Sequence, residues 1–323
     1  MVREVGQALR EAGVASPESD ARVLAEHVVG VSLVMCEGAS AEQVETLLAL
    51  VEQRSARVPL QHLTGRMWFR GLEMVCRPGV FIVRPETEVV AGAAIDAARE
   101  AAREGVGPGE CTDDGAARHR EADGAPMRAA SGAVSGEAAL VREPLVVDLC
   151  AGSGAIAAAV AAEVPTARLI AVELDAAAAA LARDNCERLV PGRVEVVQAD
   201  ATAPGTLALQ DGTVDVVVSN PPYVPAGAVE DAETERHDPD LALYGGGGDG
   251  LELPRAVVGR ASALLRRGGV LVMEHDPGQG AALREAAASA GFRSAVTGRD
   301  LTGRDRYLRA VRGVRTRSSD RPC

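Results

Sequence analysis

Alternating strand and helix patterns between residues 144 and 273 constrain the fold of this chain more than any other feature. Short apolar runs, mostly rich in Val and Leu, are separated by segments in which apolar residues have helical spacing. Because neighbouring parallel strands require a crossover connection, such alternation favours an α/β, doubly wound, mostly parallel sheet. The predicted strands are 145–149, 169–172, 194–197, 214–218 and 269–273, and the predicted helices are 155–163, 176–189 and 255–265.

The first 55 residues have a different pattern and predict a small helical domain. Ser16 followed by Pro17 is typical of a helix start, with Ser as the N-cap and Pro in the first turn. Ser40 and Gln43 have the spacing of a capping box at the start of a further helix. Apolar residues recur at helical spacing after both starts, so we expect these helices to pack together.

A linker and two irregular segments complete the predicted organisation. Apolar runs at 68–69 and 80–83, separated by turn residues, predict a β-hairpin. Gly, Ala, Pro, Ser and charged residues alternate without a period at 104–143, which predicts a disordered insert, and 314–323 predicts a flexible tail. The predicted domains are a helical domain with the start of the hairpin (1–75) and a catalytic domain (76–313).

A glycine-rich turn, residues 148–154, joins the first predicted strand of the sheet to the next helix. Glycine lets the backbone approach a ligand, and a helix N-terminus offers unpaired N–H groups. A tight turn without a ligand has the same pattern, so the turn alone leaves both readings open. It lacks the third glycine of a dinucleotide fingerprint, which argues against NAD. The candidate cofactor-binding residues here are Cys150, Ala151, Gly152, Ser153 and Gly154.

Acidic residues follow the second and third predicted strands. Glu173 lies about 20 residues beyond the glycine turn, where a carboxylate can accept hydrogen bonds from both ribose hydroxyls. Asp200 follows the third strand, where it can accept a hydrogen bond from an adenine amino group while Ala201 lines the base. A solvated carboxylate at a strand end is the alternative for each. Together with the glycine turn, these residues predict a nucleoside-binding site at the carboxyl ends of the strands.

The segment Asn220-Pro221-Pro222-Tyr223, after the fourth predicted strand, is the most specific motif in the chain. The two prolines make the loop rigid and remove two backbone donors, which leaves hydrogen-bond acceptors facing the site. The Asn220 side-chain oxygen and the Pro221 carbonyl can accept both hydrogens of a planar –NH2 group, and Tyr223 can lie over that group.

An amide or exocyclic amine nitrogen is a poor nucleophile because its lone pair is delocalised. Holding both of its hydrogens lets the nitrogen pyramidalise toward a methyl donor as positive charge develops. The motif therefore predicts methyl transfer to such a nitrogen. The candidate catalytic residues are Asn220, Pro221, Pro222 and Tyr223, with Asn220 also contacting the methyl donor.

Composition and charge narrow the expected partners and location. The 34 Lys and Arg and the 46 Asp and Glu give a net charge of −12, whereas duplex DNA binding needs a basic face, so we expect no stable nucleic-acid binding. The histidines and cysteines lack metal-ligand spacing, so we expect no metal. No apolar run reaches the roughly 18 residues of a membrane span, and the first residues do not form a signal peptide, so we expect a cytoplasmic protein.

Taken together, the motifs resemble those of the peptide chain release factor N5-glutamine methyltransferases, the HemK family. The resemblance covers most of the chain outside the predicted insert and tail. Besides the glycine turn and the Asn-Pro-Pro-Tyr segment, it includes residues 57–65 (RVPLQHLTG), 84–88 (RPETE), 241–251 (LALYGGGGDGL), 274–279 (EHDPGQ) and 300–303 (DLTG).

The resemblance implies a small N-terminal helical domain that recognises the substrate, a β-hairpin linker and a Rossmann-like class I methyltransferase domain. It implies that Cys150 to Gly154 and Glu173 bind S-adenosylmethionine, that residues 84–88 lie near this donor, and that Asn220 to Tyr223 hold the acceptor. The implied acceptor is the glutamine of the Gly-Gly-Gln loop of class I release factors. A ribosomal-protein glutamine, a nucleic-acid adenine and a binding module without catalysis remain alternatives.

The chain departs from the family pattern at positions predicted to bind the donor. Cys150-Ala151 stands where the family usually has Gly-Thr, Glu173 stands where it usually has Asp, and Ala201 replaces a bulky residue common in the adenine pocket. These changes leave the binding logic intact, so the effect expected from them is on the affinity for the donor.

Overall fold

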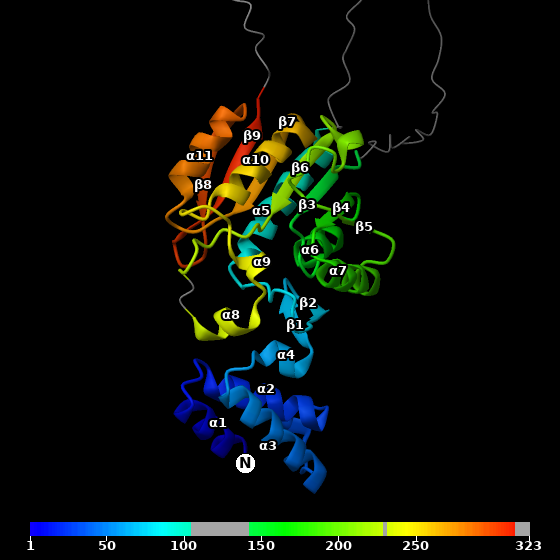
Figure 1. Ribbon diagram of the computed structural model, residues 1–323. Helices are drawn as coiled ribbons and strands as arrows, with labels where there is room; N and C mark the ends of the chain where they lie inside the picture. Colours follow the sequence, from blue (N-terminus) through cyan, green and yellow to red (C-terminus); the bar gives the residue numbers. More distant parts are fainter. Residues whose placement is uncertain (105–141, 229–230, 314–323) are drawn as a thin grey trace, which may run out of the picture.

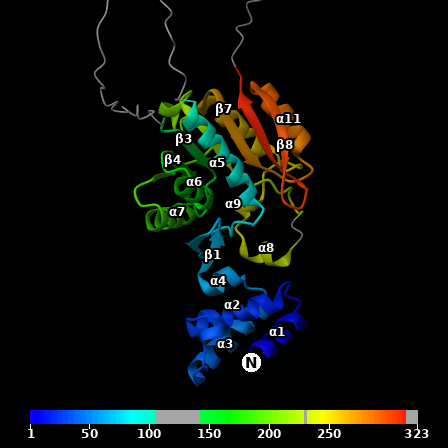
Figure 2. The ribbon, with the colours of Figure 1, turned by 180° about the vertical axis from the view of Figure 1, so that it is seen from behind.

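The computed structural model describes residues 1–104, 142–228 and 231–313. Nearly all of the predicted insert and the whole predicted tail lie outside the described residues. Figure 1 shows the N-terminal helices at one end of the molecule and the sheet with its helices at the other. The hairpin and helix α8 lie between these two parts in both ribbon views (Figures 1 and 2).

The N-terminal domain is built from three helices, α1 (Val2–Glu11), α2 (Pro17–Val29) and α3 (Ala41–Ser55), with a short 3-10 turn, η1 (Leu33–Met35). Leu9, Leu24 and Leu47 form the centre of its apolar core. The capping box at Ser40 is confirmed, because its side chain accepts from the Gln43 N–H and the Gln43 side chain accepts from the Ser40 N–H. Helix α2 starts at Pro17 as predicted, without a side-chain cap from the preceding serine.

The linker contains a short helix, α4 (Leu60–Thr64), and a hairpin of β1 (Arg66–Phe69) and β2 (Leu72–Val75). The hairpin is present, but its predicted second strand at 80–83 was wrong. The two-residue turn at 70–71 has positive φ at both positions, as a tight hairpin turn requires, so the chain pairs back at once. Val80 is instead buried against Ala178 and Leu181 of a helix, which is why an apolar run occurs there without strand pairing.

The main sheet has seven strands in the order β5-β4-β3-β6-β7-β9-β8. The five predicted strands are confirmed and are mutually parallel. Two further strands pair antiparallel at one edge and were not predicted, because they are only partly buried and contain many polar residues. The strands are β3 (Leu145–Leu149), β4 (Arg168–Glu173), β5 (Val194–Gln198), β6 (Val214–Ser219), β7 (Leu265–Glu274), β8 (Phe292–Arg299) and β9 (Asp305–Arg312).

Helices cover both faces of this sheet. Alternate residues of each central strand enter the two cores, so that Val146 and Val216 belong to one and Val147 and Val217 to the other. Because both faces are buried, these strands read as continuous apolar runs. The first face packs against α5 (Thr87–Arg103), α6 (Ala155–Glu163) and α7 (Ala176–Leu189), and the second against α10 (Glu252–Leu264) and α11 (Gly280–Ser289).

The strand order reverses between β3 and β6, which lie next to each other at the centre of the sheet. Such a switch point opens a crevice at the carboxyl ends of the strands, where α/β proteins bind ligands. The glycine turn follows β3 and the Asn220–Tyr223 segment follows β6, so the fold brings both to this crevice. A 3-10 turn, η2 (Ala208–Gln210), precedes β6, and two short helices follow it, α8 (Ala232–His237) and α9 (Asp240–Leu243).

Candidate active site

A cavity of about 340 Å³ lies at the carboxyl ends of β3, β4, β5 and β6. It brings together most of the residues predicted from the sequence. Residues from both predicted groups line it: Cys150, Gly152, Glu173, Asp200 and Ala201 from the cofactor group, and Asn220, Pro221, Pro222 and Tyr223 from the catalytic group. The nucleoside side and the acceptor side therefore share one space.

Three residues of the glycine turn, Ala151, Ser153 and Gly154, do not line this cavity. They shape the turn instead. The Ala151 N–H donates to the Val172 carbonyl of β4, and the Ser153 carbonyl accepts from the Asn185 side chain. A β-carbon at Gly154, where φ is +80°, would lie 3.2 Å from the Ala182 Cα, so a larger residue here is strained and crowds α7.

Cys150 occupies a backbone conformation that favours glycine. Its φ is +61°, and a side chain in this left-handed region costs about 1–2 kcal/mol. The departure from glycine at this position therefore carries a conformational cost in the very loop that approaches the ligand. Burial raises the pKa of the Cys150 thiol, so the thiol stays protonated and is unsuited to act as a nucleophile.

Glu173 is held in place by backbone donors before any ligand binds. Its Oε2 accepts from the Gly152 N–H at 2.7 Å, and its Oε1 accepts from the Asp175 N–H at 2.8 Å. Each carboxylate oxygen keeps a further lone pair, which can accept from a ribose hydroxyl. A β-carbon at Gly152 would meet nothing within 4 Å, so the turn leaves open space beside this carboxylate.

Asp200 is fixed in a similar way at the end of β5. Its Oδ1 accepts from the Thr202 hydroxyl at 2.7 Å and from the Thr202 N–H at 2.8 Å. These hydrogen bonds hold the pKa of the Asp200 carboxyl below its usual range, so it is ionised and can accept from an amino group. The neighbouring Ala201 is buried and lines the same part of the cavity with a small side chain.

The orientation of the Asn220 amide is set by Thr87, at the first position of α5. The Asn220 Nδ2 donates to the Thr87 Oγ1 at 3.4 Å, which leaves the Asn220 Oδ1 as the group that can accept from a substrate. Thr87 is completely buried. Sequence reasoning did not single out Thr87, although it lies within residues 84–88, which the resemblance placed near the donor.

Tyr223 is anchored by a buried carboxylate. Its phenol donates to the Glu274 Oε1 at 3.1 Å, and its carbonyl accepts from the Gln279 Nε2 at 2.8 Å. Burial raises the pKa of the Tyr223 phenol, so it stays protonated and remains a donor. Tyr223 lines the cavity, but whether it lies over a planar acceptor stays a prediction.

Glu274 ends strand β7 and is fully buried. Burial raises its pKa to about 7, although hydrogen bonds from Thr87 and Tyr223 oppose this effect. Its Oε2 has no hydrogen-bond partner among the described residues. Sequence reasoning did not assign Glu274 a role, yet an acidic residue that ends a strongly apolar strand is an available sign of one.

The glycine-rich loop at 245–250 packs directly against the backbone of this site. A β-carbon at Gly250, where φ is +69°, would collide with the Tyr223 carbonyl oxygen. The Gln279 side chain also donates to the Asp249 carbonyl at 3.0 Å. The loop therefore supports the Asn220–Tyr223 segment from behind.

Two negative findings apply to the described part of the chain. No group of three or more His, Cys, Asp or Glu side chains there is arranged to hold a metal ion. Over the same residues, no helix has both the length and the apolar character needed to cross a membrane.

The arrangement can hold a nucleoside and a planar –NH2 group in one cavity. The carboxyl groups of Glu173 and Asp200 lie on the predicted nucleoside side, and the Asn220 amide lies on the predicted acceptor side. Because the two sides are continuous, a group carried by the nucleoside can reach the nitrogen directly, without a covalent protein intermediate.

Comparisons with known proteins find similarity along nearly the whole chain. The family model of the PrmC N-terminal domain matches residues 1–65, and that of the methyltransferase small domain matches residues 138–236. The chain is 39% identical to the release factor glutamine methyltransferase of Bifidobacterium longum, over 96% of this chain and 98% of the relative. It is 40% identical to that of Streptomyces coelicolor, over 97% of each, and 39% identical to that of Mycolicibacterium smegmatis, over 95% of each.

Proposed function

This chain belongs to the release factor glutamine methyltransferase family, and we propose that it transfers a methyl group from S-adenosylmethionine to the side-chain N5 of a release factor glutamine. The acceptor would be the glutamine of the Gly-Gly-Gln loop of class I release factors, and the reaction would take place in the cytoplasm. The observation that carries this proposal is that Glu173, Asp200 and the Asn220–Tyr223 segment line one cavity.

The residues on the donor side fit S-adenosylmethionine. Glu173, backed by two backbone N–H groups, would accept from the ribose hydroxyls, and Asp200 would accept from the adenine amino group. The open space at Gly152 would admit the rest of the molecule. When bound, the donor supplies an electrophilic methyl group on a sulfonium.

On the acceptor side, two fixed oxygens would hold the glutamine amide. The Asn220 Oδ1, left free by the hydrogen bond from Nδ2 to Thr87, would accept one N–H, and the Pro221 carbonyl would accept the other. Both acceptors carry partial negative charge, so they stabilise the nitrogen as it becomes positive during transfer. The amide nitrogen loses one proton after the methyl group has moved, and no side-chain nucleophile takes part.

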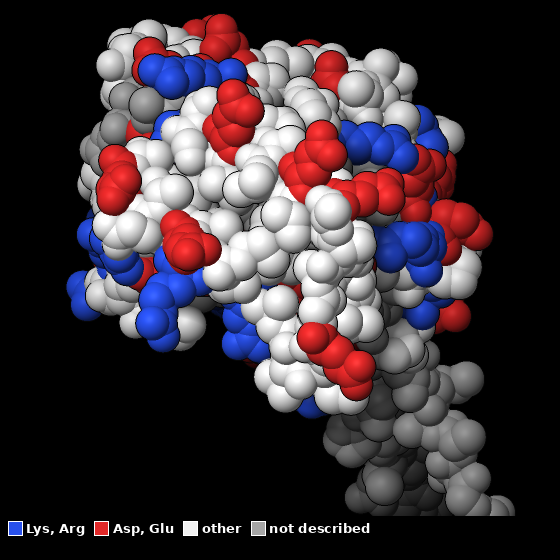
Figure 3. All heavy atoms as spheres, turned by 90° about the horizontal axis from the view of Figure 1, so that it is seen from below, with Lys and Arg blue, Asp and Glu red and all other residues white. Residues whose placement is uncertain are grey.

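Among the alternative acceptors, a nucleic-acid adenine is opposed by the surface charge. Figure 3 views the molecule from the end that carries the N-terminal helices, and basic and acidic residues are interspersed there without one continuous basic surface. A protein acceptor therefore fits this face better than a phosphate backbone does.

The test is methyl transfer from labelled S-adenosylmethionine to a purified class I release factor. Label is expected on the wild-type factor and not on a factor whose Gly-Gly-Gln glutamine is replaced. The Asn220→Ala enzyme should lose transfer by about a hundredfold or more, because it lacks one of the two oxygens that are complementary to the positive charge developing on the nitrogen. Label on a ribosomal protein or on nucleic acid instead would overturn the choice of acceptor.

A further inference from the structure

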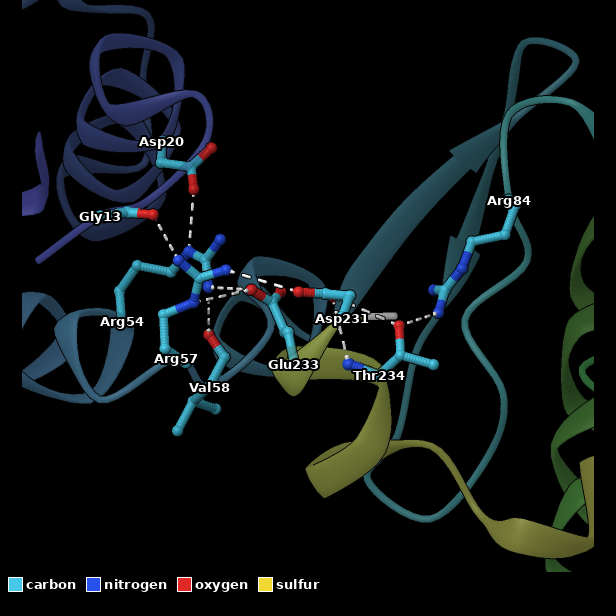
Figure 4. Close-up of polar contacts among 9 residues, drawn as sticks. All are labelled: Gly13, Asp20, Arg54, Arg57, Val58, Arg84, Asp231, Glu233 and Thr234. Atoms are coloured by element: carbon cyan, nitrogen blue, oxygen red, sulfur yellow. Dashed lines mark hydrogen bonds and ion pairs between the residues drawn. The ribbon is translucent and has the colours of Figure 1, made fainter. Parts of the chain in front are cut away.

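Helix α8 connects the wall of the cavity with the N-terminal domain. The segment 231–243 follows Asn220–Tyr223 in the chain and contributes one wall of the cavity through Thr234, Pro239, Leu241, Ala242 and Leu243. Figure 4 shows the same helix facing α3 of the N-terminal domain, with Glu233 toward Arg54 and Thr234 on the side of Arg84. Adjacent residues of one short helix thus contact the N-terminal domain and the wall of the cavity.

Arg54 makes the central contact. Its side chain is only 7% exposed, and three hydrogen bonds hold it: Nε donates to the Asp20 Oδ2 at 2.8 Å, and Nη1 donates to the Glu233 Oε2 at 2.9 Å and to the Val58 carbonyl at 3.0 Å. One buried guanidinium therefore joins a carboxylate of its own domain to a carboxylate of α8. Removal of either carboxylate leaves a buried charge with less compensation, which a protein tolerates poorly.

Two other arginines hold α8 on either side of this contact. Arg57 lies 3.6 Å from the Glu233 carboxylate and 3.7 Å from the Asp231 carboxylate, and Asp231 is the N-cap of α8. On the cavity side, the Arg84 Nη2 donates to the Thr234 Oγ1 at 3.0 Å. Polar contacts therefore hold α8 on both sides, from Arg57 of the N-terminal domain and from Arg84 of the segment that precedes α5.

We propose that Arg54 is a positioning residue of the methyl transfer: through Glu233 it holds α8 and α9 against the cavity from the N-terminal domain. The N-terminal domain then does more than recognise a substrate, because the wall beside the acceptor site depends on it. Misplacement of a reacting group by about 1 Å can cost about a hundredfold in rate, so a loosened wall has a measurable effect. The activity part of this inference rests on the proposed function, and its structural part does not.

The test uses Glu233→Gln, which leaves the N-terminal domain unaltered and keeps the Arg54–Asp20 pair. The matched control is Glu235→Gln, the same change at an exposed position of the same helix. Hydrogen exchange of segment 232–244, followed by mass spectrometry, should accelerate about tenfold in Glu233→Gln, as expected for loss of a charged hydrogen bond. The control should match the wild type.

Methyl transfer to the release factor separates positioning from docking. In Glu233→Gln, kcat should fall about tenfold while KM for the release factor changes less than about twofold, because the docking surface is intact. Arg54→Lys should recover part of the activity lost in Arg54→Gln. The double variant Arg54→Gln/Glu233→Gln should be little worse than Arg54→Gln, because Arg54→Gln has already broken the Arg54–Glu233 hydrogen bond and only the longer Arg57–Glu233 contact remains to be weakened.

Three results would overturn the proposal. They are a hydrogen-exchange rate of segment 232–244 in Glu233→Gln equal to that of the wild type, a change in the KM of Glu233→Gln for the release factor with kcat unaltered, or a loss of activity in the double variant equal to the sum of the two single losses. If the wild-type protein fails to methylate release factors, the proposed function fails. The exchange measurement still decides whether the Arg54–Glu233 contact holds the cavity wall, so the two failures are distinguishable.

Discussion

Replacing Glu274 with glutamine should make the protein more stable at alkaline pH and remove the part of its pH dependence that comes from this carboxyl. Burial raises the pKa of Glu274 from 4.5 to about 7, so the folded protein resists its ionisation. Below the pKa of the unfolded state, the Glu274 carboxyl is protonated in both states and does not lower the unfolding free energy. As the pH rises through the folded-state pKa of Glu274, the wild type loses roughly 3 kcal/mol of unfolding free energy, because the folded state must accept a buried charge.

The glutamine variant keeps the shape of the side chain and an oxygen that accepts from the Tyr223 phenol, but it cannot ionise. Urea unfolding followed by circular dichroism at about pH 5 and about pH 8.5 should therefore show the variant more stable than the wild type by roughly 2–3 kcal/mol only at the higher pH. Glu285→Gln, an exposed change on α11, serves as the control and should follow the wild type. Parallel pH profiles for the wild type and Glu274→Gln would refute the reasoning.

Three further changes test other parts of the structure. Gly154→Ala should destabilise the protein by about 2–4 kcal/mol in urea unfolding, because a β-carbon there is strained and crowds Ala182; unaltered stability would contradict the geometry. Thr87→Val should lower kcat by about tenfold with little change in donor affinity by calorimetry, because the Asn220 amide loses its partner, whereas Thr87→Ser should retain activity; equal losses in both would argue against the hydrogen bond. Ser40→Ala should lower the unfolding free energy by about 1 kcal/mol and leave the affinity for the donor unchanged. A measurable loss of donor affinity would show that the cap acts beyond its own helix.

The main elements of this protein follow from local patterns in the sequence. The five parallel strands and the longer helices between them, α6, α7 and α10, were predicted, because burial on both faces demands continuous apolar runs and the crossovers demand helical periodicity. The same alternation predicts that residues following β3, β4, β5 and β6 meet at one edge of the sheet. Most of the residues that line the candidate site could therefore be predicted from the sequence alone, including Glu173, Asp200 and Asn220.

Tertiary packing decided what local patterns leave open. The run at 80–83 was predicted as a strand because apolar residues suit a strand or a packed loop equally, and only its contact with α7 separates the two. Of the two antiparallel strands, β8 is largely exposed and has too little apolar periodicity to be recognised. Strand β9 alternates buried and half-buried positions, but charged residues occupy half of it, including the buried Arg306.

The residues that support the site could not be predicted from the sequence either. Thr87 and Glu274 are far from Asn220 in the chain, and Arg54 meets Glu233 across 179 positions. Composition and spacing describe what one segment can form by itself. Contacts of this kind depend on how whole elements pack. The sequence alone therefore determined that the candidate site lies at the carboxyl ends of the parallel strands, and only the folded structure decided which buried partners hold the site residues in place.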